Sequence, residues 1–543
     1  MSNSRKRFHV LPVSAALLAA LATGCTDTSK SNQPGNVSPS PSAGGSSEVT
    51  KKEAAYPAAL SYWVAMNSDE KAVNKDYNDM AMYKELEKRT GTKVEFQHPA
   101  GTAADQFNLL LAGNKLPDVI YWNWRDIPRG PGAAIQDKTI LRLNELIDSY
   151  APNFKKYLQD NPEMKKAITL DDGTIYAMPF LTPDQEAASF LGPIIRKDWL
   201  DKAKLQSPTT IDEWYTALKA FKATDMNGNG KNDEIPLLLD QGYLEAWSSA
   251  WGVGTSFYLD NGKVKYGPTQ PVFKEFLKTM NQWYAEKLID NDYLVTDGKL
   301  RDSKVTSQQL GALVGYVGSG IGKYMDAMTP NDPNFELVGA PFPVLKAGDK
   351  NNFGMSNLPF IGSGAAITTA SKNPEQIIKW LDYAYSREGS LLFNFGTEGV
   401  SYKMENGKPK FTDTILKNPD KLSISQALAK FAVSNGQGPF VYDSGVGSQV
   451  AARPQQAAAK KAWGLATGTG RLPGVTLTVE EGAKFDTIMG DVNTYYKEMI
   501  NKFIMGIEKT DKFDEYVKKI QSMNIDEAVK IQQAALDRYN QRK

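Results

Sequence analysis

The chain has 543 residues, with 63 Lys and Arg against 62 Asp and Glu, one cysteine and two histidines. A chain of this length can bury large apolar cores in two or more domains. The charges balance and no basic stretch stands out, so we expect no nucleic-acid partner. One cysteine and two histidines exclude an internal disulfide and a His-rich zinc site, and they leave little material for a Ser-His-Asp or Cys-His nucleophile.

The first 25 residues read as an export signal. Basic residues at 5–7 precede an apolar run at 13–21, which is shorter than the roughly 20 residues that cross a bilayer. Small residues follow and lead to Cys25, an ending that resembles the lipobox of bacterial lipoproteins, although Ala22 stands where leucine is usual. The resemblance implies that residues 1–24 are removed and that Cys25 receives lipid, with palmitate among its acyl chains. Ordinary secretion is the alternative.

The segment 25–54 that follows is rich in Ser, Gly, Pro and Asn. Such a segment cannot bury enough apolar surface to order itself, so we predict a disordered tether between the lipid and the folded body. Loss of the signal segment removes His9 and leaves His98 as the only histidine. Any histidine-dependent catalysis would therefore rest on His98.

From residue 55 onward, strand and helix patterns alternate. Strand, helix, strand, helix and strand in succession are typical of a parallel sheet in an α/β domain. The expected strands are 60–64, 93–96 and 116–122, and the expected helices are 80–89, stopped by Gly91, and a segment through 107–111 that ends at Gly113.

The later patterns are more varied. Thr210 and Glu213 have capping-box spacing, so we predict a helix that starts at Thr210 and runs over 211–221. The other expected elements are a hairpin-like segment at 171–180, glycine-dotted strands at 311–320 and 358–369, a long amphipathic helix through 485–504 and a final helix at 525–540.

Four short motifs follow one another in a fixed order: Leu-Pro-Asp-Val at 116–119, Gly-Thr-Ile-Tyr-Ala-Met-Pro at 173–179, Arg-Lys-Asp-Trp-Leu at 196–200 and Pro-Thr-Thr at 208–210. With the lipobox and tether before them, they resemble the extracellular solute-binding proteins of ABC importers, family 1, which includes maltose-binding proteins. The best match in length is the larger lipoprotein branch, similar to LplA-like and alginate-oligosaccharide-binding proteins. The resemblance covers essentially all of the chain after residue 55.

This resemblance implies a periplasmic-binding-protein-like fold, in which crossing hinge strands join two α/β lobes and a ligand binds in the cleft between them. It assigns 55–187 and 313–363 to lobe 1, and 188–312 and 364–543 to lobe 2. The crossings would fall near 186–190, 312–319 and 362–366. Glycines at 311, 315, 318, 320, 362 and 364 either serve as hinges or permit close packing.

The segment 225–234 has oxygen-bearing side chains at positions 1, 3, 5 and 9 and glycine at position 6, which suits an EF-hand-like loop around one Ca²⁺. Position 12 is Pro236 instead of glutamate, and the resemblance implies that the acid directly after position 9 replaces it. The expected ligands are Asp225, Asn227, Asn229, Asp233 and Glu234 through side chains and Lys231 through its carbonyl. An ion-free turn is the alternative. Three acids in one loop repel without a cation, which favours a structural calcium site.

Candidate ligand residues begin where the first strands end, because open α/β sheets bind ligands at the carboxyl ends of their strands. The third strand ends in the stretch that contains Trp122, Asn123, Trp124 and Arg125, and Asn67 lies just past the first strand. An aromatic face covers the C–H side of a sugar ring while polar side chains bind its hydroxyls. Packing in the core is the alternative.

Other candidates come later in the chain. Tyr243, Trp247 and Trp251 are spaced by four, so they form one stripe if 242–251 is helical. Such a stripe is either core or a stacking platform. Tyr316 lies in the expected second crossing. Glu398 and Arg453 are further candidates, although surface salt bridges explain both equally well.

The leading hypothesis is a lipid-anchored, monomeric binding protein on the extracellular face of the cell membrane. It would capture an oligosaccharide and deliver it to the permease of an ABC importer without any chemical step. The alternatives are a secreted, calcium-containing polysaccharide lyase or hydrolase, which would work with a pair of carboxylates, and a surface adhesin or sensor partner. The sequence contains no Gly-x-x-x-x-Gly-Lys-Ser/Thr loop, so ATP hydrolysis would belong to another subunit. The class of sugar, neutral or uronic, stays open.

Overall fold

The computed structural model describes residues 55–113, 115–184, 188–356, 358–433, 438–451 and 453–542. The expected signal segment, the tether, Cys25 and part of the first crossing lie outside these residues. Within the described ranges, every helix is too short or too polar to span a membrane.

The first sheet has five strands in the order β2-β1-β3-β11-β4. The three expected strands β1 (Ala59–Trp63), β2 (Lys93–Gln97) and β3 (Val119–Asn123) are parallel, as predicted. The strand β11 (Ser363–Ile367) runs antiparallel to β3 and to β4 (Met178–Pro179). The expected hairpin-like element at 171–180 is instead a turn followed by β4, which pairs with β11.

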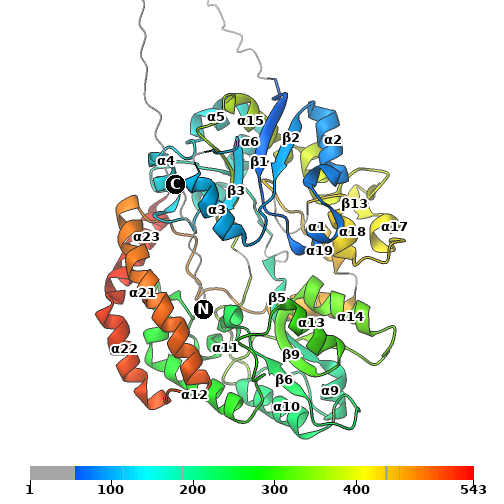
Figure 1. Ribbon diagram of the computed structural model, residues 1–543, viewed down its shortest axis with the longest axis vertical. Helices are drawn as coiled ribbons and strands as arrows, with labels where there is room; N and C mark the ends of the chain where they lie inside the picture. The colour runs from blue at the N-terminus through cyan, green and yellow to red at the C-terminus, as the bar shows by residue number, and fades with distance from the viewer. Residues whose placement is uncertain are drawn as a thin grey trace, which may run out of the picture. The chain divides into compact units, whose positions relative to one another are not determined.

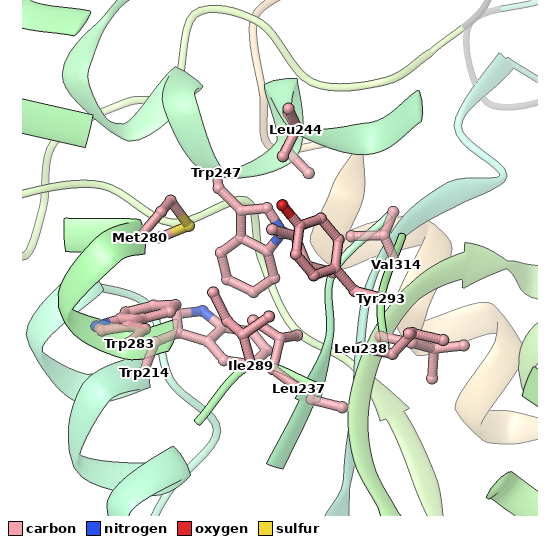
Figure 2. Packing of buried hydrophobic residues seen from close by; sticks show 14 of the residues in the cluster. Trp214, Leu237, Leu238, Leu244, Trp247, Met280, Trp283, Ile289, Tyr293 and Val314 are labelled. Carbon is pink, nitrogen blue, oxygen red and sulfur yellow. The ribbon is translucent and has the colours of Figure 1, made fainter. Parts of the chain in front are cut away.

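The second sheet has four strands in the order β10-β5-β9-β6. The strands β6 (Ile235–Leu238) and β9 (Leu310–Tyr316) are parallel, whereas β5 (Leu191–Arg196) is antiparallel to β9 and to β10 (Leu337–Gly339). Each sheet has its own apolar core, and Figure 2 shows part of the second one, built around Trp214, Trp247 and Trp283.

Helices accompany both sheets (Figure 1). The segments that carry the first sheet contain α1 (Ser68–Val73), α2 (Ala81–Thr90), α3 (Ala103–Ala112), α4 (Gly130–Gln136), α5 (Asn144–Tyr150), α6 (Pro152–Asp160), α7 (Pro162–Ile168), α15 (Pro374–Asp382) and α16 (Arg387–Phe395). The segments that carry or pack on the second contain α9 (Lys197–Lys202), α10 (Ile211–Ala223), α11 (Glu245–Ser248), α12 (Pro271–Ala285), α13 (Gly298–Thr306), α14 (Lys323–Met328), α20 (Pro454–Trp463), α21 (Val479–Ile504), α22 (Phe513–Ser522) and α23 (Ile525–Gln541).

The helix start predicted at Thr210 is confirmed. Thr210 caps α10, where its side chain accepts from the Glu213 backbone N–H while Glu213 bonds back, as the capping box predicts. The long helix α21 begins at the similar pair Thr478 and Glu481. The described residues also form two β-hairpins. One consists of β7 (Phe257–Asp260) and β8 (Lys263–Tyr266), and the other of β12 (Tyr402–Glu405) and β13 (Lys408–Phe411). The second hairpin shares a small third core with α17 (Asp413–Leu416), α18 (Ile424–Ala429) and α19 (Ser444–Val450).

The strand pairing corrects the expected lobe boundaries. The strand β9 is hydrogen-bonded on both sides within the second sheet, so it is no crossing, and β10 also belongs there. Residues 313–339 therefore group with the second sheet and not with the first. Conversely β11 lies in the first sheet, α15 packs on α5 and α18 packs on α1. The chain leaves the second sheet between β10 and β11 and returns to it at α20, which packs on β10.

Close packing accounts for several of the glycines considered as hinges. A Cβ on Gly311 would lie 2.8 Å from the rings of both Phe221 and Trp199. Gly362 has a φ of 103°, a conformation that favours glycine, and its Cβ position is filled by the Asn123 side chain. These positions are therefore explained by contact with their neighbours.

Candidate functional site

The two sheets present their strand ends to a shared crossing segment. The strand β4 runs parallel to β3, because β11 is antiparallel to both. From the carboxyl end of β4 the chain passes to Leu191, which pairs with Tyr316 at the carboxyl end of β9. The segment between β4 and β5 therefore connects two sheet edges. At one edge β3 and β4 end, and at the other β6 and β9 end. These are the edges at which open α/β sheets bind ligands.

At the second sheet, three aromatic residues meet at this edge. Tyr316 ends β9 and stays 41% exposed. Its ring stacks on Phe190, with centroids 5.8 Å apart and planes 7° apart. The Tyr243 hydroxyl, from the loop after β6, donates to the Tyr316 hydroxyl at 3.3 Å. Burial and this hydrogen bond raise the pKa of Tyr243, so it stays protonated and donates.

Two of these three aromatics were sequence candidates, and Phe190 was missed. Its position directly before the apolar strand β5 was the available signal. Together they form what we call the aromatic edge: Phe190, Tyr243 and Tyr316. A partly exposed ring flanked by hydroxyls suits the C–H face and the hydroxyl groups of a sugar.

At the first sheet, polar groups occupy the corresponding edge. The Asn123 amide donates to Asp126 at 2.7 Å, and Asp126 is exposed. Asn67 caps α1, because its Oδ1 accepts from the backbone N–H groups of Asp69 at 2.9 Å and Glu70 at 3.0 Å. The Asn67 oxygen is thus engaged in holding the first turn of α1, and it positions Asp69.

The two candidate tryptophans of this stretch have different surroundings, because Trp122 lies within β3 and Trp124 lies beyond its end. The strand ends at Asn123, so the period-two alternation stops before Trp124. Trp124 is fully buried and its Nε1 donates to the Gly364 carbonyl at 3.1 Å. Trp122 stacks on Phe107, with centroids 4.4 Å apart. Core packing, the alternative considered above, explains Trp124.

Two backbone carbonyls bind the guanidinium of Arg125. Its guanidinium donates to Phe360 O at 3.0 Å and to Ala167 O at 2.8 Å, and it lies 4.6 Å from the centre of the Phe360 ring. These contacts tie the end of β3 to the segment that precedes β11.

The expected stripe over 242–251 is broken into three short turns, η2 (Gln241–Tyr243), α11 and η3 (Ser249–Trp251). Trp247 is 0% exposed and lies edge-to-face with Trp214 at 4.9 Å and Trp283 at 5.9 Å (Figure 2). Trp251 is half-buried against Phe276. The structure therefore separates Tyr243 at the edge from Trp247 in the core.

The two remaining candidates lie in other surroundings. Arg453 forms an ion pair with Asp326 at 2.6 Å, in line with the salt-bridge alternative. Glu398 is exposed in the turn that precedes β12, beside the small third core. Neither belongs to the strand ends described above.

The loop 225–234 is wound around Asp225. The Oδ1 of Asp225 accepts from the backbone N–H groups of Gly228 at 2.7 Å and Asn229 at 3.1 Å, and Oδ2 accepts from Gly230 at 2.8 Å. The amides of Asn227 and Asn229 point at Asp233. Glu234 is 2% exposed; Met226 N–H donates to its Oε1 at 2.7 Å.

The donor chemistry of this loop fits calcium. Within the described ranges no three acidic, histidine or cysteine side chains are gathered as a metal site. However, the buried Oε2 of Glu234 has no hydrogen-bond partner among the described residues, and such an orphaned buried oxygen is costly. The other side chains of the loop offer carboxylate and amide oxygens, the ligands that Ca²⁺ prefers.

His98 has a structural role. The two ring nitrogens are both engaged: Nδ1 lies 2.8 Å from the Val64 carbonyl, to which it donates, and Nε2 accepts from the Tyr77 backbone N–H at 3.2 Å. The two contacts hold the ring in one orientation. Nucleophilic catalysis would depend on His98, and both of its ring nitrogens are engaged by the backbone of Val64 and Tyr77.

Known proteins resemble this chain over most of its length. The profile of the family described as bacterial extracellular solute-binding protein matches residues 67–390. The fructooligosaccharide ABC transporter substrate-binding protein FusA of Streptococcus pneumoniae is 26% identical over 501 residues, which cover 86% of this chain and 89% of FusA. Lipoprotein LipO of Bacillus subtilis is 26% identical over 79% of this chain and 80% of its own. The polygalacturonan/rhamnogalacturonan-binding protein YtcQ of Bacillus subtilis is 29% identical over 60% of this chain and 64% of its own.

Solved structures share the fold. The alginate-binding protein AlgQ2, solved without calcium ion, is 29% identical with a TM-score of 0.74 and covers 90% of this chain and 100% of that one. FusA of S. pneumoniae in complex with kestose has the same TM-score at 24% identity, over 89% of this chain and 100% of that one. FusA is named as the substrate-binding protein of an ABC transporter, and YtcQ and AlgQ2 are named as binding proteins. With the sequence match and the two α/β sheets described above, they show that this chain belongs to the bacterial extracellular solute-binding proteins, the ligand-capturing components of ABC importers.

Proposed function

We propose that this protein captures an oligosaccharide and delivers it to the membrane permease of an ABC importer. The observation that carries the proposal is the aromatic edge, where the Tyr316 ring is stacked on Phe190, hydrogen-bonded to Tyr243 and still 41% exposed. Stacking on such a ring needs no charge on the ligand, and the flanking hydroxyls can bind those of a sugar. The names of FusA, YtcQ and AlgQ2, each a sugar-binding protein, support the same class of ligand.

In this proposal the protein binds its ligand without cleaving it. The sole histidine of the described body is engaged by backbone groups, and the relatives are named as binding proteins. Closure of the two lobes would follow from tighter binding in the closed state. A lipid on Cys25, supported by the name of lipoprotein LipO, would hold the monomer at the outer face of the membrane.

The test is a thermal-shift screen of residues 46–543 against neutral and uronic oligosaccharides, with each ligand recovered afterwards and weighed by mass spectrometry. A ligand present at 100 times its dissociation constant stabilises the fold by about 2.7 kcal/mol. We expect one oligosaccharide to raise the melting midpoint and to be recovered uncut. Recovery of shortened sugar would show an enzyme, and no shift with any sugar would contradict the proposal.

We also propose that the loop 225–234 binds one structural Ca²⁺, with Asp225, Asn227, Asn229, Asp233 and Glu234 as side-chain ligands and the Lys231 carbonyl completing the set. The titles of the AlgQ2 structure without calcium and of a FusA EF-hand mutant support it. The ion would balance the three carboxylates that the loop carries and partner the orphaned Glu234 oxygen.

Removal of calcium with a chelator should lower the melting midpoint, and added Ca²⁺ should restore it. At a free concentration of 100 times its dissociation constant, Ca²⁺ adds about 2.7 kcal/mol to the free energy of unfolding. Glu234→Gln should abolish most of this response, because it removes a charge from the ligand set. Asp349→Asn, which changes an exposed acid in another loop, is the matched control. An unchanged midpoint of the wild-type protein in chelator would show that the loop is an ion-free turn.

A further inference from the structure

We propose that the site takes neutral oligosaccharides and discriminates against uronates, an inference that rests on the proposed sugar-binding function. At the two strand-end edges, Arg125 and Lys323 are bound by protein partners and Asp240 opposes Arg301 at Tyr243. Two carboxylates, those of Asp69 and Asp126, lie at the first-sheet edge.

Arg125 is the cation best placed by sequence to bind a uronate, since it directly follows the end of β3. Recognition of a carboxylate by arginine needs the guanidinium fork to face the ligand. Here the fork donates to Phe360 O and Ala167 O, 3.0 and 2.8 Å away, and lies over the Phe360 ring. To reach a ligand, Arg125 would have to leave both carbonyl groups, and its Nε is buried without a hydrogen-bond partner among the described residues.

The cations of the second-sheet edge are balanced as well. Lys323, at the start of α14, pairs with Asp302 at 2.6 Å. Arg453, which lies outside this edge, is engaged as well, because it donates to Asp326 through Nε at 2.9 Å and Nη2 at 2.6 Å. Arg301 and Asp240 act on the pKa of Tyr243 in opposite senses, and the effect of Asp240 is the larger. At Tyr243 the aromatic edge therefore has no excess of positive charge.

The first-sheet edge carries negative charge. Asp126 is exposed and accepts one hydrogen bond, from the Asn123 amide at 2.7 Å. Asp69 lies in the first turn of α1 and is half-buried, which raises its pKa, while the charge of Lys323 opposes this shift. A carboxylate that has lost part of its hydration gains most from hydroxyl donors, and a neutral sugar supplies many of them. A uronate would bring a like charge to the same groups.

The test is a calorimetric titration with two sets of tetrasaccharides of equal length, neutral ones (nystose, cellotetraose and mannotetraose) and uronic ones (tetragalacturonate and tetramannuronate). We expect a neutral sugar to bind at least about tenfold tighter than either uronate, since an unpaired like charge opposes the uronate. A uronate that binds tighter than every neutral sugar would overturn this inference and leave the sugar-binding function standing. No binding by either set would overturn both.

The variant Asp69→Asn/Asp126→Asn separates charge from shape. It should weaken the binding of the neutral sugar about tenfold, through loss of charge-assisted hydrogen bonds, and it should strengthen the binding of the uronates. The ratio of neutral to uronic affinity should therefore fall. Asp349→Asn should change neither affinity. The melting midpoint of each variant is measured alongside, and only folded variants are compared. An unchanged ratio of neutral to uronic affinity in the folded double variant would overturn the inference.

Discussion

Replacement of Trp247 by alanine should lower the free energy of unfolding by about 3–5 kcal/mol. The side chain is 0% exposed and its neighbours Trp214 and Trp283 meet it edge-to-face (Figure 2). Alanine would leave a cavity among rigid rings that cannot close over it. Urea unfolding of the wild-type protein and the variant measures the difference.

The matched control is Tyr243→Ala, four residues earlier in the same segment. Tyr243 is half-buried at the edge of the second sheet, so its loss should cost less stability and should instead weaken sugar binding. If Trp247→Ala kept a near-wild-type midpoint but lost sugar binding, the stripe interpretation would be right and the core assignment wrong.

Replacement of Lys304 by methionine should cost about 3–5 kcal/mol, because it leaves a buried carboxylate without its partner. Lys304 pairs with Asp290, and their side chains are 9% and 5% exposed. Lys304 also donates to Thr296 at 3.0 Å, so the pair fastens the segment after α12 to α13. The quantity to measure is the free energy of unfolding in urea.

Two further variants test the cause of this loss. Lys278→Met breaks an exposed pair with Glu275, at 47% and 53% exposure, and should cost less than about 1 kcal/mol. The double variant Lys304→Met/Asp290→Leu removes both buried charges and should recover much of the stability, since a buried pair and an apolar replacement are often similar. Equal costs for Lys304→Met and Lys278→Met would contradict this account.

Local patterns in the sequence were enough to predict the three parallel strands of the first sheet and several helices. The parallel strands β1, β2 and β3 and the capped helix α10 follow from apolar periodicity and capping residues, which act over a few positions. The pairing of β9 between β5 and β6 depends on residues more than 70 positions away, as in the register of Ile235 with Leu310. Periodicity carries no such information, so the lobe boundaries after residue 312 were wrong.

The site was predictable in part for the same reason. Tyr243 was a candidate through its spacing with Trp247 and Trp251, and Tyr316 through the expected second crossing. Trp247 had the same spacing signal as Tyr243 and lies in the core, as does the candidate Trp124. The sequence alone does not distinguish a tryptophan buried in a core from one that lies at the edge of a sheet. The inward turn of Arg125 depends on carbonyls of Phe360 and Ala167, which distant segments bring to it.

The most direct measurement is a calorimetric titration of the wild-type protein and of Tyr316→Ala with the oligosaccharide that raises the melting midpoint most. The ring is 41% exposed, so the variant should keep its fold. We expect one uncut ligand per chain, and an affinity at least about tenfold weaker in the variant, a loss of about 1.4 kcal/mol. An unchanged affinity in a folded Tyr316→Ala protein would show that the sugar binds elsewhere than at the aromatic edge.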